Sequence, residues 1–119
     1  MTTGRLTTHV LDTARGKPAA GVRITLCRIT DGGRVALAET VTNADGRTDA
    51  PMLAGDALTV GVYELIFAAG DYLRDSGQAA GEVLFLGDIP IRFGVPNAGQ
   101  HYHVPLLISP FAYSTYRGS

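Results

Sequence analysis

Cysteine is nearly absent from this sequence, and neither sign of charge dominates it. Cys27 is the single cysteine in 119 residues, which excludes an internal disulfide and a multi-cysteine metal site. One thiol suits a reducing compartment, and packing is its simplest role. The net charge is only -1 and no run of basic residues occurs, so nucleic acid and anionic membranes are poor candidates as partners.

Long hydrophobic runs are missing as well. No apolar stretch reaches the ~20 residues that a membrane-spanning helix needs, and no signal peptide precedes Leu6. We therefore expect a cytoplasmic protein. Linkers, internal repeats and low-complexity segments are also absent, so residues 1–119 are expected to form a single domain.

The residues that are present are apolar for so short a chain. Hydrophobic residues make up 45 % of the sequence and charged residues 18 %. A monomer of this size has difficulty hiding that much apolar surface, and large exposed apolar patches mark sites of association. The composition therefore favours an oligomer.

The hydrophobic pattern predicts an all-β chain with one short helix. Alternation and turn signals, of which Asp31-Gly32-Gly33 is the strongest, indicate seven to eight short strands in a Greek-key β-sandwich. Strands are expected at residues 5–12, 21–29, 34–41, within 51–58, at 61–68 and 89–95, from His101 to Ser109, and in a short segment after Pro110. The helix is expected to start with Asp71 as its cap and to end at Gly77. Pro90 predicts an unpaired edge, and residues 78–88 are ambiguous.

Strand parity turns the three histidines away from the core. Because alternate side chains of a strand point to opposite faces, burial of Leu6 and Val10 sends His9 outward. On the last long strand, His101 and His103 lie opposite a buried apolar face. That apolar face consists of Tyr102, Val104, Leu106 and Ile108.

Each of these polar residues also has a plain structural interpretation. His9 fits a solvated strand position, and Arg47 fits a surface position beside the turn at residues 43–46. His101 and His103, with His9 as a third ligand, fit a metal site, although no Asp, Glu or Cys has a matching spacing. The final four residues fit a flexible tail, against which Tyr116 argues because an aromatic ring favours burial.

The parities also permit a catalytic interpretation. If the histidine strands share a sheet, Arg47 and two imidazoles gather on one surface, which suits a planar ligand rich in carbonyl groups. A nearby guanidinium disfavours imidazolium, so the histidines stay neutral and able to accept a proton from water near pH 7. No Ser-His-Asp triad and no glycine-rich phosphate loop can be assembled from the sequence.

Three segments resemble the transthyretin-like 5-hydroxyisourate hydrolases. They are Leu-Thr-Thr-His-Val-Leu-Asp at 6–12, Asp-Gly-Arg-Thr at 45–48, and the C-terminal block from His-Tyr-His at 101–103 to the ending Tyr-Arg-Gly-Ser at 116–119. The blocks lie at the start, middle and end, so the resemblance covers essentially the whole chain. Paired carboxylates are missing from all three blocks. One departure lies at 83–90, where the family's aromatic-aromatic-proline block is replaced by Val-Leu-Phe-Leu-Gly-Asp-Ile-Pro.

The resemblance implies a function and a set of roles. It implies a transthyretin-like sandwich that hydrolyses 5-hydroxyisourate, a product of urate oxidation, without metal or other cofactor, as a homotetramer built from two dimers. His9 and His103 would move the proton and orient water, and Arg47 would bind substrate oxygens and stabilise negative charge. Tyr116 would hold the ring, Ser119 would line the site, and His101, Arg117 and Gly118 would support it. Which histidine is the base stays open, as do two other functions: a small-molecule carrier like transthyretin, and a β-sandwich interaction domain.

Overall fold

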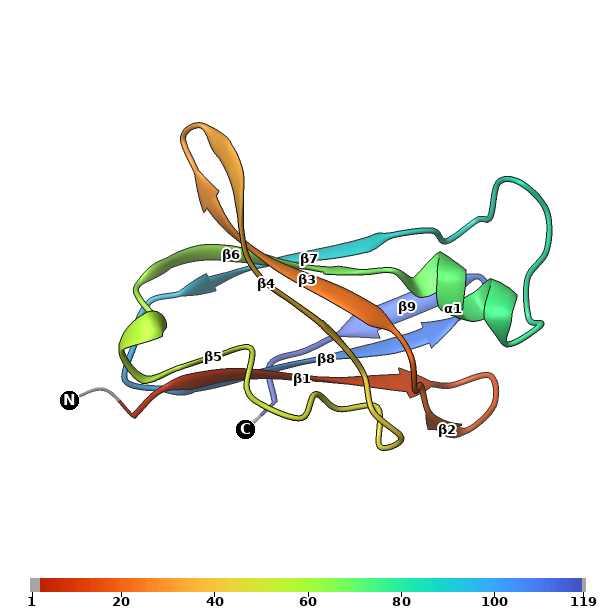
Figure 1. The fold of residues 1–119 in the computed structure, drawn as a ribbon, viewed down its shortest axis with the longest axis horizontal. Coiled ribbons are helices and arrows are strands. Elements are labelled where there is room, and N and C mark those ends of the chain that lie inside the picture. Colours follow the sequence, from red (N-terminus) through yellow and green to blue (C-terminus); the bar gives the residue numbers. More distant parts are fainter. Residues whose placement is uncertain (1–2, 119) are drawn as a thin grey trace.

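Two β-sheets make up most of the structure, a computed structural model that describes residues 3–118 (Figure 1). The first sheet has the strand order β2-β1-β8-β9, with β5 also paired to β1, and the second has the order β4-β3-β6-β7. The elements are β1 (Arg5–Asp12), β2 (Lys17–Pro18), β3 (Arg23–Thr30), β4 (Gly33–Val41), β5 (Leu53–Ala54), a 3-10 turn (Gly55–Ala57), β6 (Gly61–Phe67), α1 (Ala69–Asp75), β7 (Ile89–Val95), β8 (His101–Ser109) and β9 (Ala112–Thr115). The predicted all-β sandwich with one short helix is confirmed.

The first and last long strands lie side by side although they are far apart in sequence. The chain passes repeatedly between the two sheets, and β1 then pairs with β8 in parallel along its whole length. The register places Thr7 opposite His103 and His9 opposite Pro105. Residues paired in this way point to the same face of a sheet. This pairing brings the N-terminal and C-terminal motif blocks together.

The predicted parities are correct, and they set the core. Leu6, Val10, Leu106 and Ile108 are fully buried between the sheets, and the aromatic ring of Tyr102 joins them. β3, β6 and β7 contribute the facing side chains of the same hydrophobic cluster. These facing residues include Ile24, Leu26, Tyr63, Leu65, Phe67, Ile89 and Ile91. Burial of these side chains fixes the register, because a slip of one residue would turn every one of them to water.

The helix ends where the sequence predicts but starts elsewhere. Asp71 is not its cap: α1 begins at Ala69 after an N-cap at Ala68 that makes no side-chain hydrogen bond, and Asp71 lies in the first turn. Gly77 closes the helix with φ +76°, donating to the Arg74 carbonyl while the next amide donates to the carbonyl of Leu73. Only glycine adopts this backbone conformation without strain.

Two segments differ from the expected strand pattern. The turn-rich connection after β1 contains the short strand β2, whose Lys17 and Pro18 pair with the end of β1. The ambiguous segment 78–88 forms neither helix nor strand in the described structure. Phe85 lies in it with 73 % of its surface exposed, and its ring centroid is 5.9 Å from that of Phe111. Pro90 lies on β7, the edge strand of the second sheet, as predicted.

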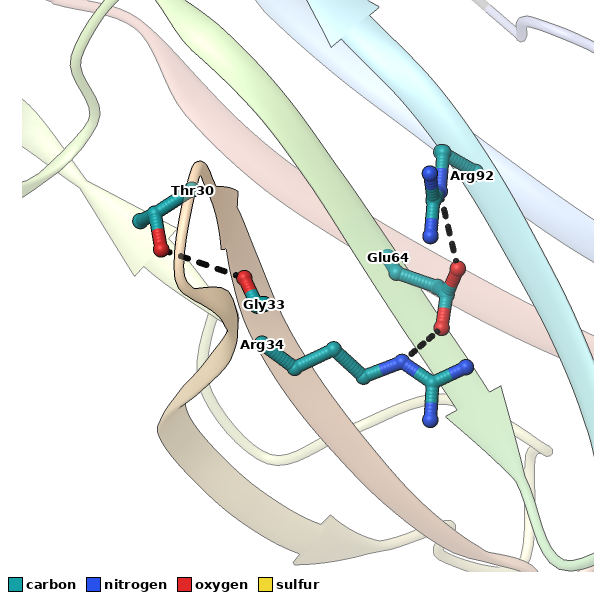
Figure 2. A network of polar contacts seen from close by, with 5 residues as sticks. All are labelled: Thr30, Gly33, Arg34, Glu64 and Arg92. Carbon is teal, nitrogen blue, oxygen red and sulfur yellow. Dashed lines mark hydrogen bonds and ion pairs between the residues drawn. The ribbon is translucent and has the colours of Figure 1, made fainter.

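The outer face of the second sheet carries a buried acid between two arginines (Figure 2). Glu64 is only 3 % exposed; Arg92 Nε donates to its Oε2 at 3.0 Å, and Arg34 Nε lies 2.7 Å from Oε1 in an ion pair. Nearby, the predicted Asp31-Gly32-Gly33 hairpin is closed by pairing of Thr30 with Gly33. Loss of either arginine would leave the buried carboxylate underpaired, so we interpret this network as structural. Among residues 3–118 no helix is long and apolar enough to cross a membrane.

Candidate functional site

The outer face of the first sheet collects the polar residues that the sequence singled out. Parallel pairing of β1 with β8 puts Arg5 beside His101 and Thr7 beside His103, and His9 follows two residues along on the same face. Two further segments reach this face from either edge. Arg47 forms a β-bridge with His9, and Gly118 forms one with His103.

A tight turn holds Arg47 against β1. The Asn43 side-chain oxygen accepts hydrogen bonds from the amides of Asp45, at 2.9 Å, and Arg47, at 3.2 Å. Gly46 has φ +75°, and its carbonyl accepts the Val10 amide at 2.8 Å. A Cβ at this glycine would lie 2.4 Å from the Val10 carbonyl oxygen, so no larger residue fits the turn. The Asp-Gly-Arg motif therefore fixes the main chain from which the guanidinium projects.

The same turn fixes the tautomer of His9. Nε2 of His9 lies 2.9 Å from the backbone carbonyl oxygen of Asp45. A carbonyl oxygen only accepts, so Nε2 must carry the ring proton. In the neutral ring Nδ1 then has a free lone pair. Nδ1 is therefore the atom of His9 that can accept a proton.

A threonine hydroxyl joins the other two histidines. Thr7 Oγ1 lies 2.8 Å from Nδ1 of His103 and 3.1 Å from Nε2 of His101. Nε2 is therefore the ring nitrogen of His103 that stays available for a ligand. His103 is half-buried, whereas His101 is exposed to solvent.

The C-terminal segment packs closely on His103. The Gly118 amide donates to the carbonyl oxygen of His103 at 2.7 Å, and a Cβ at position 118 would lie 2.7 Å from the ring atom Cδ2. Arg117 stacks over the Tyr102 ring with its guanidinium carbon 4.4 Å from the centroid, and it donates to the Gln100 side chain. Gly118 thus allows the tail to approach the His103 ring closely, and Arg117 anchors the tail to Tyr102 and Gln100.

The two other predicted tail residues have different outcomes. Tyr116 lines the site as expected, but its predicted burial is wrong for the single chain, because 57 % of its surface is exposed. Tyr116 follows the edge strand β9, where the described residues leave its side chain largely open to solvent. Ser119 lies outside the described residues, so its predicted place in the site stays a prediction.

His9 and His103 both have lowered pKa values, which favour the neutral form of each ring. Burial lowers the pKa of His103 below its usual 6.5, and the positive charge of Arg47 lowers it further, with smaller effects from His9 and His101. Burial and then Arg47 also lower the pKa of His9, against the opposing influence of the Asp45 carbonyl and carboxylate. The guanidinium disfavours a second positive charge nearby, as the sequence analysis anticipated.

An open groove of about 540 Å³ runs over this surface. Its lining joins β1, β8, the 47–51 segment and the tail, and it includes Arg47, His101, His103, Tyr116, Gly118 and Thr7. His9 is not among the lining residues, although a positive charge on its ring would lower the pKa of His103. The groove thus offers a guanidinium, an imidazole that favours its neutral form and a phenol to a flat polar ligand.

The histidines do not form a metal-ligand set. Within residues 3–118, no three His, Cys, Asp or Glu side chains gather in a way that could hold a metal ion. The contacts of Thr7 were missed by sequence reasoning, which treated this residue as one polar member of an alternating strand. No local signal in the sequence could have shown these contacts, because the parallel pairing of β1 with β8 decides which residue faces His103.

The structure is thus a small β-sandwich protein. A groove with an arginine and histidines, residues common in enzyme active sites, lies on the outer face of one sheet. The chain belongs to the HIUase/Transthyretin family, whose sequence model matches residues 6–118. A 5-hydroxyisourate hydrolase of Mesorhizobium japonicum is 62 % identical over 116 residues, which cover 98 % of this chain and 93 % of that protein.

Two solved structures show the same fold. The crystal structure of (S)-allantoin synthase superposes with a TM-score of 0.92 at 47 % identity, and the match covers 99 % of this chain but only 44 % of that longer chain. Sea bream transthyretin in complex with thyroxine superposes with a TM-score of 0.85 at 29 % identity, covering 96 % of this chain and 94 % of that one. The fold therefore occurs both in an enzyme and in a protein that binds thyroxine.

Proposed function

We propose that this protein hydrolyses 5-hydroxyisourate to 2-oxo-4-hydroxy-4-carboxy-5-ureidoimidazoline, a step of urate degradation. The observation that carries the proposal is the groove in which Arg47 and the neutral His103 face the same space. The name of the Mesorhizobium relative, at 62 % identity over nearly the full chain, supports the same substrate.

The chemistry follows from the donors and acceptors in the groove. Water attacks a ring carbonyl, and His103 accepts a proton from it at Nε2, since Nδ1 is engaged by Thr7. Arg47 binds the substrate oxygens and stabilises the negative charge that develops on the attacked carbonyl. His9 orients the substrate or the water through its free Nδ1. Tyr116 packs against the ring, and Ser119 is proposed to complete the end of the groove.

The reaction is proposed to need no metal. The attacking water is activated by an imidazole whose pKa lies below its usual value, and the cation that stabilises charge is Arg47. Chelator treatment followed by desalting is therefore expected to leave the rate unchanged. Stoichiometric zinc in the purified protein, with activity that is lost on its removal, would favour a metal mechanism instead.

A carrier is the second candidate, because the sea bream relative binds thyroxine on the same fold. A carrier needs a ligand channel but no proton acceptor beside a cation. Both are present here in His103 and Arg47, and Gly118 of the terminal motif packs on His103. The hydrolase therefore accounts for more of the site than the carrier does.

The deciding experiment follows freshly made 5-hydroxyisourate by its absorbance in the presence of purified, metal-free protein. We expect its decay to accelerate in proportion to protein concentration, and His103→Asn protein at equal concentration serves as the control. Binding of the compound without any acceleration would support the carrier and reject the hydrolase.

A further inference from the structure

The proposed reaction uses the contact of Thr7 with His103 but leaves unused the second contact of the same hydroxyl, with His101. Its Oγ1 lies within hydrogen-bond distance of Nδ1 of His103 and of Nε2 of His101. A hydroxyl has one proton to donate, so it cannot donate to both rings. At least one of the two histidines must therefore donate its ring proton to Thr7.

One arrangement of donors and acceptors in these two hydrogen bonds fits the proposed chemistry of the groove. For His103 to accept a proton at Nε2, its Nδ1 must carry the ring proton and donate it to Thr7. The threonine hydroxyl is then free to donate to Nε2 of His101. The row His103–Thr7–His101 therefore runs from a half-buried ring that lines the groove to a ring that is exposed to solvent.

We infer that His103, Thr7 and His101 form a proton relay that connects the groove to bulk water. The inference rests on the proposed hydrolysis. When water attacks, His103 Nε2 gains a proton, Nδ1 passes its proton to Thr7 Oγ1, and Thr7 passes its own proton to Nε2 of His101. His101 then releases the proton on its Nδ1 to solvent.

The relay resets itself within one turnover. The leaving ring nitrogen takes the Nε2 proton of His103, Nδ1 of His103 takes back the Thr7 proton, and Thr7 takes back the Nε2 proton of His101. His101 regains a proton from solvent at Nδ1. One proton leaves and one returns, so the cycle is balanced and His103 acts as base and then as acid.

The charges beside His103 disfavour a proton that stays on this ring. Arg47 faces His103 from the 43–47 segment, and His9 faces it from β1, and both oppose an imidazolium at this position. Arg5 and Asp49 also line the groove, and the tail contributes only Tyr116 and Gly118 there among the described residues. A proton moved to His101 leaves the immediate surroundings of the Arg47 guanidinium. Arg5 lies beside His101 in the strand register, but both residues are exposed, so water screens the charge between them.

Three substitutions separate proton transfer from simple positioning. Thr7→Val keeps the shape of the side chain and removes the hydroxyl, whereas Thr7→Ser keeps the hydroxyl. His101→Gln keeps a side chain able to hydrogen-bond with Thr7 but cannot take up a proton. Thr25→Val, the same change on β3 of the other sheet, is the matched control.

We expect Thr7→Val and His101→Gln each to lower kcat by roughly 10- to 100-fold, with KM little changed. Thr7→Ser and Thr25→Val should stay near wild type. The two slow variants should become faster with rising buffer concentration, because buffer replaces the lost proton path, whereas the wild-type rate should not depend on buffer. Wild-type rates for both variants would overturn the relay, as would a slow Thr7→Val with a normal His101→Gln.

A second readout does not depend on activity and so separates failure of the relay from failure of the proposed reaction. Nitrogen-15 NMR of the histidine rings reports the tautomer in the folded protein. We expect the neutral ring of His103 to carry its proton on Nδ1, and Thr7→Val to change its tautomer populations. A His103 ring protonated on Nε2 in the wild type would overturn the relay, whether or not the protein hydrolyses 5-hydroxyisourate.

Discussion

Hydrogen bonds to fixed partners decide what each histidine of the site can do. The Asp45 carbonyl requires a proton on Nε2 of His9, and Thr7 occupies Nδ1 of His103. The nitrogen that remains without such a partner therefore differs between the two rings: it is Nδ1 in His9 and Nε2 in His103. An asparagine at either position mimics only one of the ring nitrogens and cannot transfer a proton near neutral pH.

At this scale we predict that His9→Asn, Arg47→Ala and His103→Asn each lose most activity while they stay folded. Their outward positions mean that truncation removes little core, so stability should change by less than about 1 kcal/mol. The rate should fall by ~10²-fold or more if the residues act in proton transfer or charge stabilisation. Initial rates and circular dichroism on the same preparations check this. Near wild-type rates in all three variants would show that the site lies elsewhere.

The pH dependence follows from the lowered pKa values of His9 and His103. Activity requires the neutral rings, so we expect the rate to persist at pH 6.5 and to fall only at lower pH, as protonation sets in below the usual value. Removing the guanidinium in Arg47→Gln should raise both pKa values, because a positive neighbour no longer opposes imidazolium. NMR titration of the ring protons measures this directly. No upward movement in Arg47→Gln would contradict the electrostatic coupling.

Gly118 gives a prediction that depends on space alone. A Cβ at this position would lie 2.7 Å from Cδ2 of His103, so Gly118→Ala must displace either the tail or the ring. A displacement of about 1 Å in such a site can cost roughly 10²-fold in rate. The control is Gly94→Ala on β7, where a Cβ meets no atom within 4 Å and the rate should not change. Equal rates for both variants would show that the site tolerates the displacement.

At the scale of elements, the strands and their faces could be predicted and their neighbours could not. Alternation in the sequence is a local signal, so the outward position of His9, His101 and His103 followed from residues a few places away. The pairing of Thr7 with His103 joins positions 96 apart in the chain, and no local pattern encodes it. The start of α1 was misjudged because Asp71 suits a cap by residue type, whereas the chain enters the helix at Ala68 with no side-chain cap. What the sequence could not predict was which strands pair and in which register, because these depend on contacts between distant residues.

The end of β1 is tied to the helix by a buried carboxylate. Asp12 is 1 % exposed and accepts hydrogen bonds from the Tyr72 hydroxyl at 2.6 Å and from the Gln78 amide at 2.8 Å. Burial alone would raise the pKa of Asp12, but the hydrogen bonds from Tyr72, the Arg15 amide and Gln78 outweigh it and lower the pKa. The stabilisation is therefore complete above the unfolded pKa of about 3.9 and is lost as the pH falls through the lower folded value.

We predict that Tyr72→Phe destabilises the fold by about 1–3 kcal/mol, because it leaves a buried carboxylate with one partner fewer. The folded pKa of Asp12 should rise, so acid unfolding should begin at a higher pH than in the wild type. Tyr113→Phe is the control, since that tyrosine is 46 % exposed and should change stability little. Urea unfolding at pH 7 and at pH 4 measures both effects. An unchanged midpoint for Tyr72→Phe would mean that this contact does not stabilise the junction.

At the scale of the whole molecule, the site lies on a sheet face that residues 3–118 of the same chain leave uncovered. The groove is open, and Tyr116 projects there with more than half of its surface exposed. In water, exposed charges are screened, so Arg47 would act weakly on a bound ligand. A second copy placed over this face would exclude solvent and close the groove. Sheets stacked face to face lie ~10 Å apart, and a slightly wider gap would admit a flat bicyclic ligand.

We therefore predict a homotetramer, a dimer of dimers, with its sites between subunits. Closed symmetry favours dimers and pairs of dimers over open chains, and the high apolar content of the sequence supplies contact surface. Light scattering on a sizing column should give four times the chain mass of 12.5 kDa. Activity per chain should fall on dilution in step with dissociation, because a separated subunit leaves its groove open to water. A stable monomer that retains full activity at every dilution would contradict a site built between subunits and would place the whole reaction within the groove of one chain.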